Sequence, residues 1–467
     1  MRDRSDRTRR DRLPVTGDQL ILPAVTGHGS RVTPLLVLLL LVLRPVPAAG
    51  LGPAVVQDTL PNGAALLVSE QHNLPMVLVR VVLDAGARRD PEGRAGVASL
   101  TADLLTEGTA TRSAQQIADA VDFIGASLDS DADMDYAVVA LQVLRKDLDT
   151  GLDLLADVLL HPAFKPEELA RRREAALASI RAARDDPTDV AQKAFQRALF
   201  GDTPYGHPTE GTEESVARIS RADVQDFFRR YYGPARAAVV VVGDLSPGEA
   251  RERFARVLGS WRGEATAPFV YPPLAEPAAR QIRIDRSVTQ AAIVMGNLGI
   301  ARGNPDYEAV AVMDYVLGSG GFSSRLMENI RTQAGLAYSV ASFFAARKSP
   351  GPFEIVMQTK NASVDDAIAR ARQEVERIRA APISDDELQE AKRYLTGSFA
   401  LRLDSDSKIA DFIAQAWFYD LGMDYADIYM RRVNAVSIAD VLRVAQAYLH
   451  PDRFIEVAVT STKDAAP

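Results

Sequence analysis

The chain contains short apolar runs separated by longer stretches in which apolar residues recur every three or four positions. The short runs predict strands at 76–83, 137–143, 237–242, 291–295 and 454–459. The longer stretches predict amphipathic helices at 94–106, 113–124, 146–159, 166–184, 221–232, 306–317, 324–332, 363–379, 384–403 and 438–449. This mixture predicts an α+β fold in which helices pack on one face of each β-sheet.

An internal repeat divides the chain into two halves. Residues 219–224 match residues 436–441 at a constant offset of 217 positions, from 219 to 436. Three further residues, Tyr231, Pro234 and Arg236, recur at that offset as Tyr448, Pro451 and Arg453. Each copy opens with a serine followed three residues later by an aspartate, which is the pattern of a helix capping box. Because this period is far longer than that of a solenoid repeat, it predicts two homologous domains.

Prolines concentrate between the two copies, at residues 265–279, and this composition indicates a linker. We therefore expect an N-terminal domain at 51–262, a linker at 263–280 and a C-terminal domain at 281–467. Residues 1–50 form a separate segment.

That first segment has the features of an export signal. The apolar run 33–43 has the length of a signal-peptide core, and small residues at Val46, Ala48 and Ala49 offer a cleavage site. We expect export to the periplasm of a Gram-negative bacterium, with no stable membrane anchor after cleavage.

Composition narrows the function classes. A formal net charge of -8 gives no electrostatic reason to expect a nucleic-acid partner. The absence of cysteine excludes disulfides, thiolate metal ligands and cysteine nucleophiles. The five histidines (His28, His72, His161, His207 and His450) do not pair at metal-ligand spacing.

The segment 318–338 is the strongest candidate for a functional site. It combines a glycine-rich turn (Gly318, Gly320, Gly321), a helix that carries Arg331, and a break at Gly335 before Tyr338 on the next strand. Arg331 and Tyr338 end in hydrogen-bond donors suited to a peptide carbonyl or a developing oxyanion. The simpler alternatives are a helix-dipole contact for Arg331, an ordinary strand position for Tyr338, and a tight turn for the glycines.

This segment, together with residues 290–296 and 306–307, resembles the signature of the insulinase and mitochondrial-processing-peptidase family of inverted-motif zinc peptidases. The resemblance extends over nearly the whole chain beyond residue 50. It implies a two-domain, half-clamshell subunit that closes around a peptide. It also implies that Arg331 and Tyr338 help to hold the substrate, with Gly318, Gly320 and Gly321 as further substrate contacts.

Active members of that family bind zinc through a His-x-x-Glu-His helix and a distal glutamate. The matching context lies at 96–109, where the two histidine positions hold Ser99 and Asp103 and the general-base position holds Ala102. The distal glutamate position falls near Ser179. A serine hydroxyl is a poor zinc ligand, one aspartate cannot replace a three-ligand site, and alanine cannot act as a base, so we expect no metal in this chain and no peptide hydrolysis by the chain alone.

The resemblance therefore implies the non-catalytic, substrate-binding subunit of a heterodimeric zinc endopeptidase that acts on peptides or unfolded segments. Zinc is expected on a homologous partner subunit. The competing hypothesis is a non-enzymatic peptide-binding, chaperone or scaffold protein that kept the fold. An active peptidase with an unusual metal site is the remaining alternative.

Overall fold

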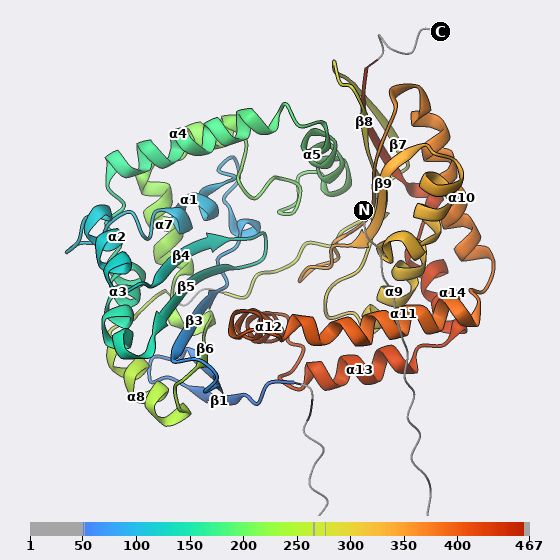
Figure 1. Ribbon diagram of the computed structural model, residues 1–467. Coiled ribbons are helices and arrows are strands. Elements are labelled where there is room, and N and C mark those ends of the chain that lie inside the picture. The colour runs from blue at the N-terminus through green and yellow to red at the C-terminus, as the bar shows by residue number, and fades with distance from the viewer. Residues whose placement is uncertain (1–49, 51, 265–266, 276, 462–467) are drawn as a thin grey trace, which may run out of the picture. The chain divides into compact units, whose positions relative to one another are not determined.

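The computed structural model describes residues 50, 52–264, 267–275 and 277–461, and Figure 1 shows their helices and strands. The expected export segment, including the apolar run 33–43, lies outside the described residues except for Gly50. In the part of the chain that is described, no helix is long and apolar enough to cross a membrane.

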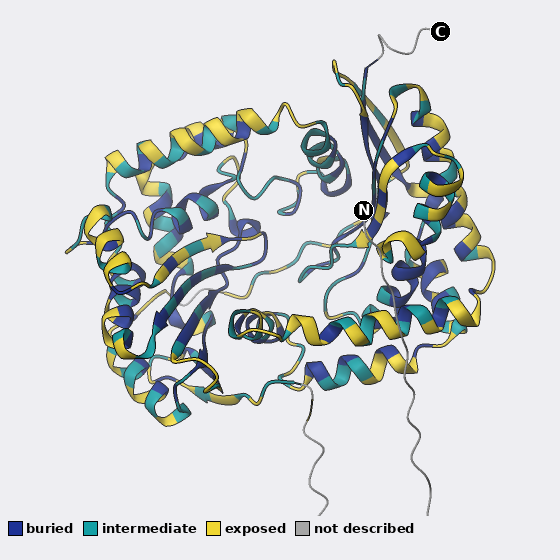
Figure 2. Ribbon diagram, viewed as in Figure 1, coloured by how far each residue is buried: buried dark blue, intermediate teal, exposed yellow. Residues whose placement is uncertain are grey.

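The first half is built on a six-stranded mixed sheet with the order β1-β2-β6-β3-β5-β4. Its strands are β1 (Val56–Thr59), β2 (Ala65–Glu70), β3 (Met76–Leu83), β4 (Ser127–Ala132), β5 (Ala137–Leu144) and β6 (Ala237–Gly243). Only β2 and β6 pair in parallel. Strand β6 is buried along its whole length, which explains why its sequence is a continuous apolar run (Figure 2).

The second half repeats this order with one strand fewer. Its five-stranded sheet has the order β7-β11-β8-β10-β9, with β7 and β11 in parallel. Its strands are β7 (Arg280–Asp285), β8 (Ala291–Leu298), β9 (Ala337–Phe344), β10 (Pro352–Thr359) and β11 (Ile455–Thr460). Strand β9 is an edge strand and occupies the position that β4 has in the first sheet. The prediction of two homologous α+β domains is confirmed.

The helices follow the same repeat. Those of the first half are α1 (Val97–Asp103), α2 (Ala114–Phe123), α3 (Leu148–Leu160), α4 (Pro166–Ala183), α5 (Pro187–Phe200), α6 (Glu213–Arg218), α7 (Arg221–Tyr231) and α8 (Pro247–Val257). Those of the second half are α9 (Tyr307–Asp314), α10 (Val364–Ala380), α11 (Asp385–Gly397), α12 (Asp406–Phe418), α13 (Tyr425–Ala435) and α14 (Ile438–Tyr448). The capping boxes predicted at Ser220 and Ser437 are present at the starts of α7 and α14.

One helix of each half packs on the sheet of the other half. Helix α12 covers the second face of the first sheet, where Ile413 and Ala414 pack against Leu67 and Val240. Helix α5 lies on β8 and β11 of the second sheet (Figure 1). The sequence patterns predicted neither helix. Each sheet therefore carries its own helices on one face and a helix of the other half on the opposite face.

Candidate functional site

The segment 315–338 departs from regular α-helix on both sides of its glycine-rich turn. Helix α9 continues into a π-helical turn at Tyr315–Ser319, and a second π-helical stretch follows at Met327–Gln333. A short 3-10 turn, Gly321–Ser323, joins them. The helices predicted at 306–317 and 324–332 are thus present, but both change to π-helical hydrogen bonding where they meet β9. Such π-helical turns are uncommon and occur frequently at functional sites.

The three glycines have different structural roles. Gly318 is buried, and a Cβ there would lie 2.3 Å from Ser342 Oγ on β9. A Cβ on Gly320 would lie 2.5 Å from the carbonyl oxygen of Tyr315. Gly321 has a φ of +59° and is exposed, with open space beside it. Gly318 and Gly320 therefore permit close packing, whereas Gly321 forms the outer turn. A substrate contact at any of the three stays a prediction.

Tyr338 lies at a β-bulge in strand β9. Ala337 pairs with Thr359 and Ser339 pairs with Gln358, so Tyr338 is the extra residue of β9. Its side chain is 77% exposed. Because a bulge redirects the side chain that it carries, Tyr338 projects from the edge strand instead of packing into the core.

Arg331 lies between two exposed aromatic rings. Its guanidinium carbon is 5.6 Å from the ring centroid of Tyr338 and 4.7 Å from that of Phe322. Among the described residues, no side chain forms a hydrogen bond or ion pair with the Arg331 guanidinium or the Tyr338 hydroxyl. By contrast, nearby Arg325 donates two hydrogen bonds to Glu387, of 2.7 and 2.9 Å. The structure therefore brings Arg331 and Tyr338 together with their donors free.

A buried carboxyl group fastens the glycine-rich turn to β9. Asp314, at the end of α9, accepts a hydrogen bond from Ser342 Oγ and interacts with the Ser319 side chain. Burial raises the pKa of Asp314 to about 6, and these hydrogen bonds oppose the increase. The turn is thus anchored by a group that titrates near neutral pH.

The degenerate zinc positions lie on α1 and α4. Ala102 is buried, Ser99 and Asp103 are half-buried, and Ser179 is exposed. Burial raises the pKa of Asp103, and the charge of Arg172 opposes this. No group of three histidine, aspartate or glutamate side chains in the described part of the chain is arranged to hold a metal ion. Two serine hydroxyls and one carboxylate do not match the ligand set that holds zinc in active members, and the methyl group of Ala102 cannot serve as a general base.

An ion-pair cluster links the two helices that carry these positions. Glu107, just beyond α1, is buried and accepts hydrogen bonds from Arg171 and Arg172 of α4. Burial alone would raise the pKa of Glu107, but these two guanidinium groups lower it. These ion pairs therefore tie the end of α1 to α4, the two helices that carry the degenerate zinc-site positions.

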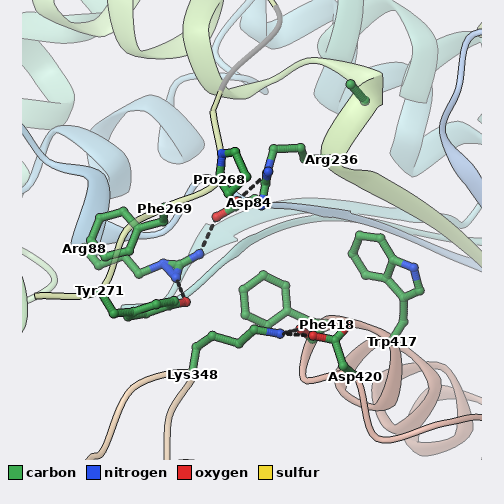
Figure 3. A pocket seen from close by; sticks show the side chains of 11 residues that line it. Asp84, Arg88, Arg236, Pro268, Phe269, Tyr271, Lys348, Trp417, Phe418 and Asp420 are labelled. Atoms are coloured by element: carbon green, nitrogen blue, oxygen red, sulfur yellow. Dashed lines mark hydrogen bonds and ion pairs between the residues drawn. The ribbon is translucent and has the colours of Figure 1, made fainter.

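A cavity of about 460 Å³ lies where the two halves and the segment between them meet (Figure 3). Arg88 there contacts Asp84 and Tyr271, and Lys348 pairs with Asp420. These charged groups are already paired with one another. We therefore interpret the cavity as part of the interface between the two halves.

Two residues of the site were missed by sequence reasoning. Phe322 directly follows Gly320 and Gly321 in the sequence. An aromatic residue within a glycine-rich turn is the sequence feature that could have indicated its exposure. Glu107 lies between the former zinc helix and Gly108, but nothing in the sequence indicated its two arginine partners, which lie more than sixty positions away.

Family models match both halves of the chain, and known proteins match most of its length. Residues 66–213 match the family model of insulinase, peptidase family M16, and residues 218–395 match that of the peptidase M16 inactive domain. An uncharacterized zinc protease of Mycobacterium leprae is 30% identical over 366 residues, which cover 76% of this chain and 80% of that protein. One of Streptomyces coelicolor is 27% identical over 403 residues, covering 84% of this chain and 87% of that protein.

A solved structure agrees with these relatives. The crystal structure of a peptidase M16 inactive domain from Pseudomonas fluorescens superimposes with a TM-score of 0.83 and 29% identity. The match covers 88% of this chain and 98% of that one. The resemblance inferred from the segment 318–338 is confirmed, and the chain belongs to the insulinase family of peptidases, family M16.

Proposed function

We propose that this chain is the non-catalytic, substrate-holding subunit of a heterodimeric zinc endopeptidase that acts on peptides or unfolded segments. The observation that carries the proposal is the pair Arg331 and Tyr338, which lie close together, Arg331 half-buried and Tyr338 exposed, with no hydrogen-bond partner for either side-chain donor among the described residues. The positions that match the zinc ligands of active members carry Ser99, Asp103 and Ser179 instead, and the general-base position carries Ala102. Zinc would then belong to a homologous partner subunit, and the zinc proteases among the relatives support this.

The chemistry of the pair suits a substrate backbone. The guanidinium of Arg331 presents several N–H donors in one plane, and the Tyr338 hydroxyl adds one more. Together they would bind the carbonyl oxygen of an extended peptide and orient it. A donor that meets the oxygen better as negative charge develops on it would lower the barrier as well as improve binding.

The test uses the chain mixed with a purified zinc-bearing homologue from the same organism. The mixture should cleave an unfolded protein in a chelator-sensitive way, and neither subunit should do so alone. Arg331→Ala and Tyr338→Phe should each lower kcat/KM by about tenfold or more, as expected for the loss of a donor to the reacting carbonyl. Arg218→Ala, at an exposed ion pair with Glu214, is the matched control.

Unchanged kcat/KM in both variants would show that the pair has no part in the reaction. Peptide binding by the isolated chain, with no cleavage in any mixture, would favour the chaperone or scaffold alternative. Export to the periplasm is part of the same proposal, and it rests on the apolar run 33–43. Cell fractionation of the native host checks it directly.

A further inference from the structure

We infer that Phe322 is a positioning residue, which holds the Arg331 guanidinium against its ring face and leaves the N–H donors of Arg331 free for substrate. This inference rests on the proposed function, because it concerns the same site. Its evidence is separate, however: the geometry of the glycine-rich turn and the surroundings of the cation.

The turn holds Phe322 in a fixed, outward position. Buried Ser324 donates hydrogen bonds to the carbonyl oxygen of Gly321 from its Oγ, at 2.7 Å, and from its backbone N–H, at 3.0 Å. These two bonds close the short 3-10 turn around Phe322. The phenyl ring is nevertheless 74% exposed, so the turn does not serve to bury it.

The inference depends on whether the partner of Arg331 is a carboxylate or an aromatic ring, because the two leave different numbers of N–H donors free. A carboxylate partner occupies guanidinium N–H groups, as Glu387 does with Arg325. An aromatic face attracts the cation through its quadrupole and supplies no oxygen acceptor that would compete with substrate for the N–H groups. With Phe322 and Tyr338 as ring neighbours, Arg331 is held in place while its donors stay available.

This arrangement predicts a graded response to the ring at position 322. In the assembled complex, Phe322→Leu should lower kcat/KM by about two- to fivefold, the effect of one exposed cation–π contact. Phe322→Tyr and Phe322→Trp should retain activity, because both keep a π face. Phe123→Leu, at a 91% exposed phenylalanine on α2, is the matched control and should change nothing.

A double-mutant cycle separates positioning from a general structural role. In the Arg331→Ala background, Phe322→Leu should have no further effect on kcat/KM, because its target is absent. A similar loss in both backgrounds, or full activity of Phe322→Leu, would overturn the inference.

If Arg331→Ala itself leaves kcat/KM unchanged, the proposed function fails and the Phe322 contact is judged on the isolated chain. The Arg331 Nε–H resonance, assigned with Arg331→Lys, should carry a ring-current shift that Phe322→Leu reduces. An unchanged resonance would show that the ring does not hold the guanidinium.

Discussion

The two arginines near the glycine-rich turn, Arg325 and Arg331, differ in whether their charge is paired with a carboxylate. Arg325 is bound to Glu387, while Arg331, six residues further on, has two aromatic rings beside it and no hydrogen-bond or ion-pair partner among the described side chains. The motif alone predicted the identities of Arg331 and Tyr338 and their proximity in sequence. It could not predict that Arg331 lacks a carboxylate partner, because that depends on which side chains the fold brings near it.

Asp314 makes a residue-scale prediction about pH. Its pKa is about 6 in the folded protein, against an ordinary value of 3.8, so folding favours its protonated form. That stabilisation is present below about pH 4 and is lost as pH rises through 6. Relative to Asp314→Asn, which stays neutral and can still accept from Ser342, the wild type should lose up to about 3 kcal/mol of unfolding free energy between pH 4 and 7.

Urea unfolding of both proteins at several pH values measures this difference, and buried acids common to both proteins cancel. A difference that does not change with pH would mean that Asp314 has the same pKa in the folded and unfolded chains.

At the scale of elements, clear start signals gave the most reliable bounds. Helices α4, α7 and α14 and strand β3 lie within a residue of their predicted bounds, because α4 begins at a proline, α7 and α14 follow capping serines, and β3 is an apolar run. The π-helical turns around Gly318 and the bulge at Tyr338 could not be predicted. Both arise where the chain adjusts to β9, and that adjustment is a tertiary contact.

The α1–α4 contact gives a prediction at this scale. Glu107→Gln keeps the shape of the side chain but removes the charge that Arg171 and Arg172 share. The loss of charge-assisted hydrogen bonds to a buried carboxylate should cost about 2 kcal/mol of unfolding free energy. The control, Glu214→Gln at an exposed pair with Arg218, should change stability by less than about 0.5 kcal/mol.

Chemical denaturation measures both variants. Equal, small effects would mean that Glu107 contributes no more than a surface charge and that the α1–α4 contact is held by packing alone.

For the whole molecule, the exchange of α5 and α12 between the sheets has a consequence for folding. Phe195 of α5 belongs to the same apolar core as Val294 and Val457 of the second sheet. Ile413 of α12 packs with residues of the first sheet. Each half therefore lacks part of its cover when the other half is missing.

Calorimetry should consequently show one cooperative transition for both halves. Ile413→Ala removes buried apolar volume from the contact between α12 and the first sheet. It should lower that single Tm and reduce the unfolding free energy by about 2–5 kcal/mol. Two separate transitions, with only one shifted by the variant, would show that the halves fold independently.

The sequence by itself determined the α+β class, the duplication, the family resemblance, the substitution of the zinc-ligand positions by Ser99, Asp103 and Ser179, and the substitution of the general-base position by Ala102. These features depend on local periodicity and on residue identity, which can be recognised position by position. Only the tertiary structure decided that Arg331 lies free between Phe322 and Tyr338 and that Glu107 links α1 to α4. It also decided that each half covers the sheet of the other. The Glu107 contacts and the exchange of helices join residues distant in sequence, which no local pattern predicts. The Arg331 contacts join near neighbours in sequence, but they depend on how the glycine-rich turn and the β-bulge fold against β9.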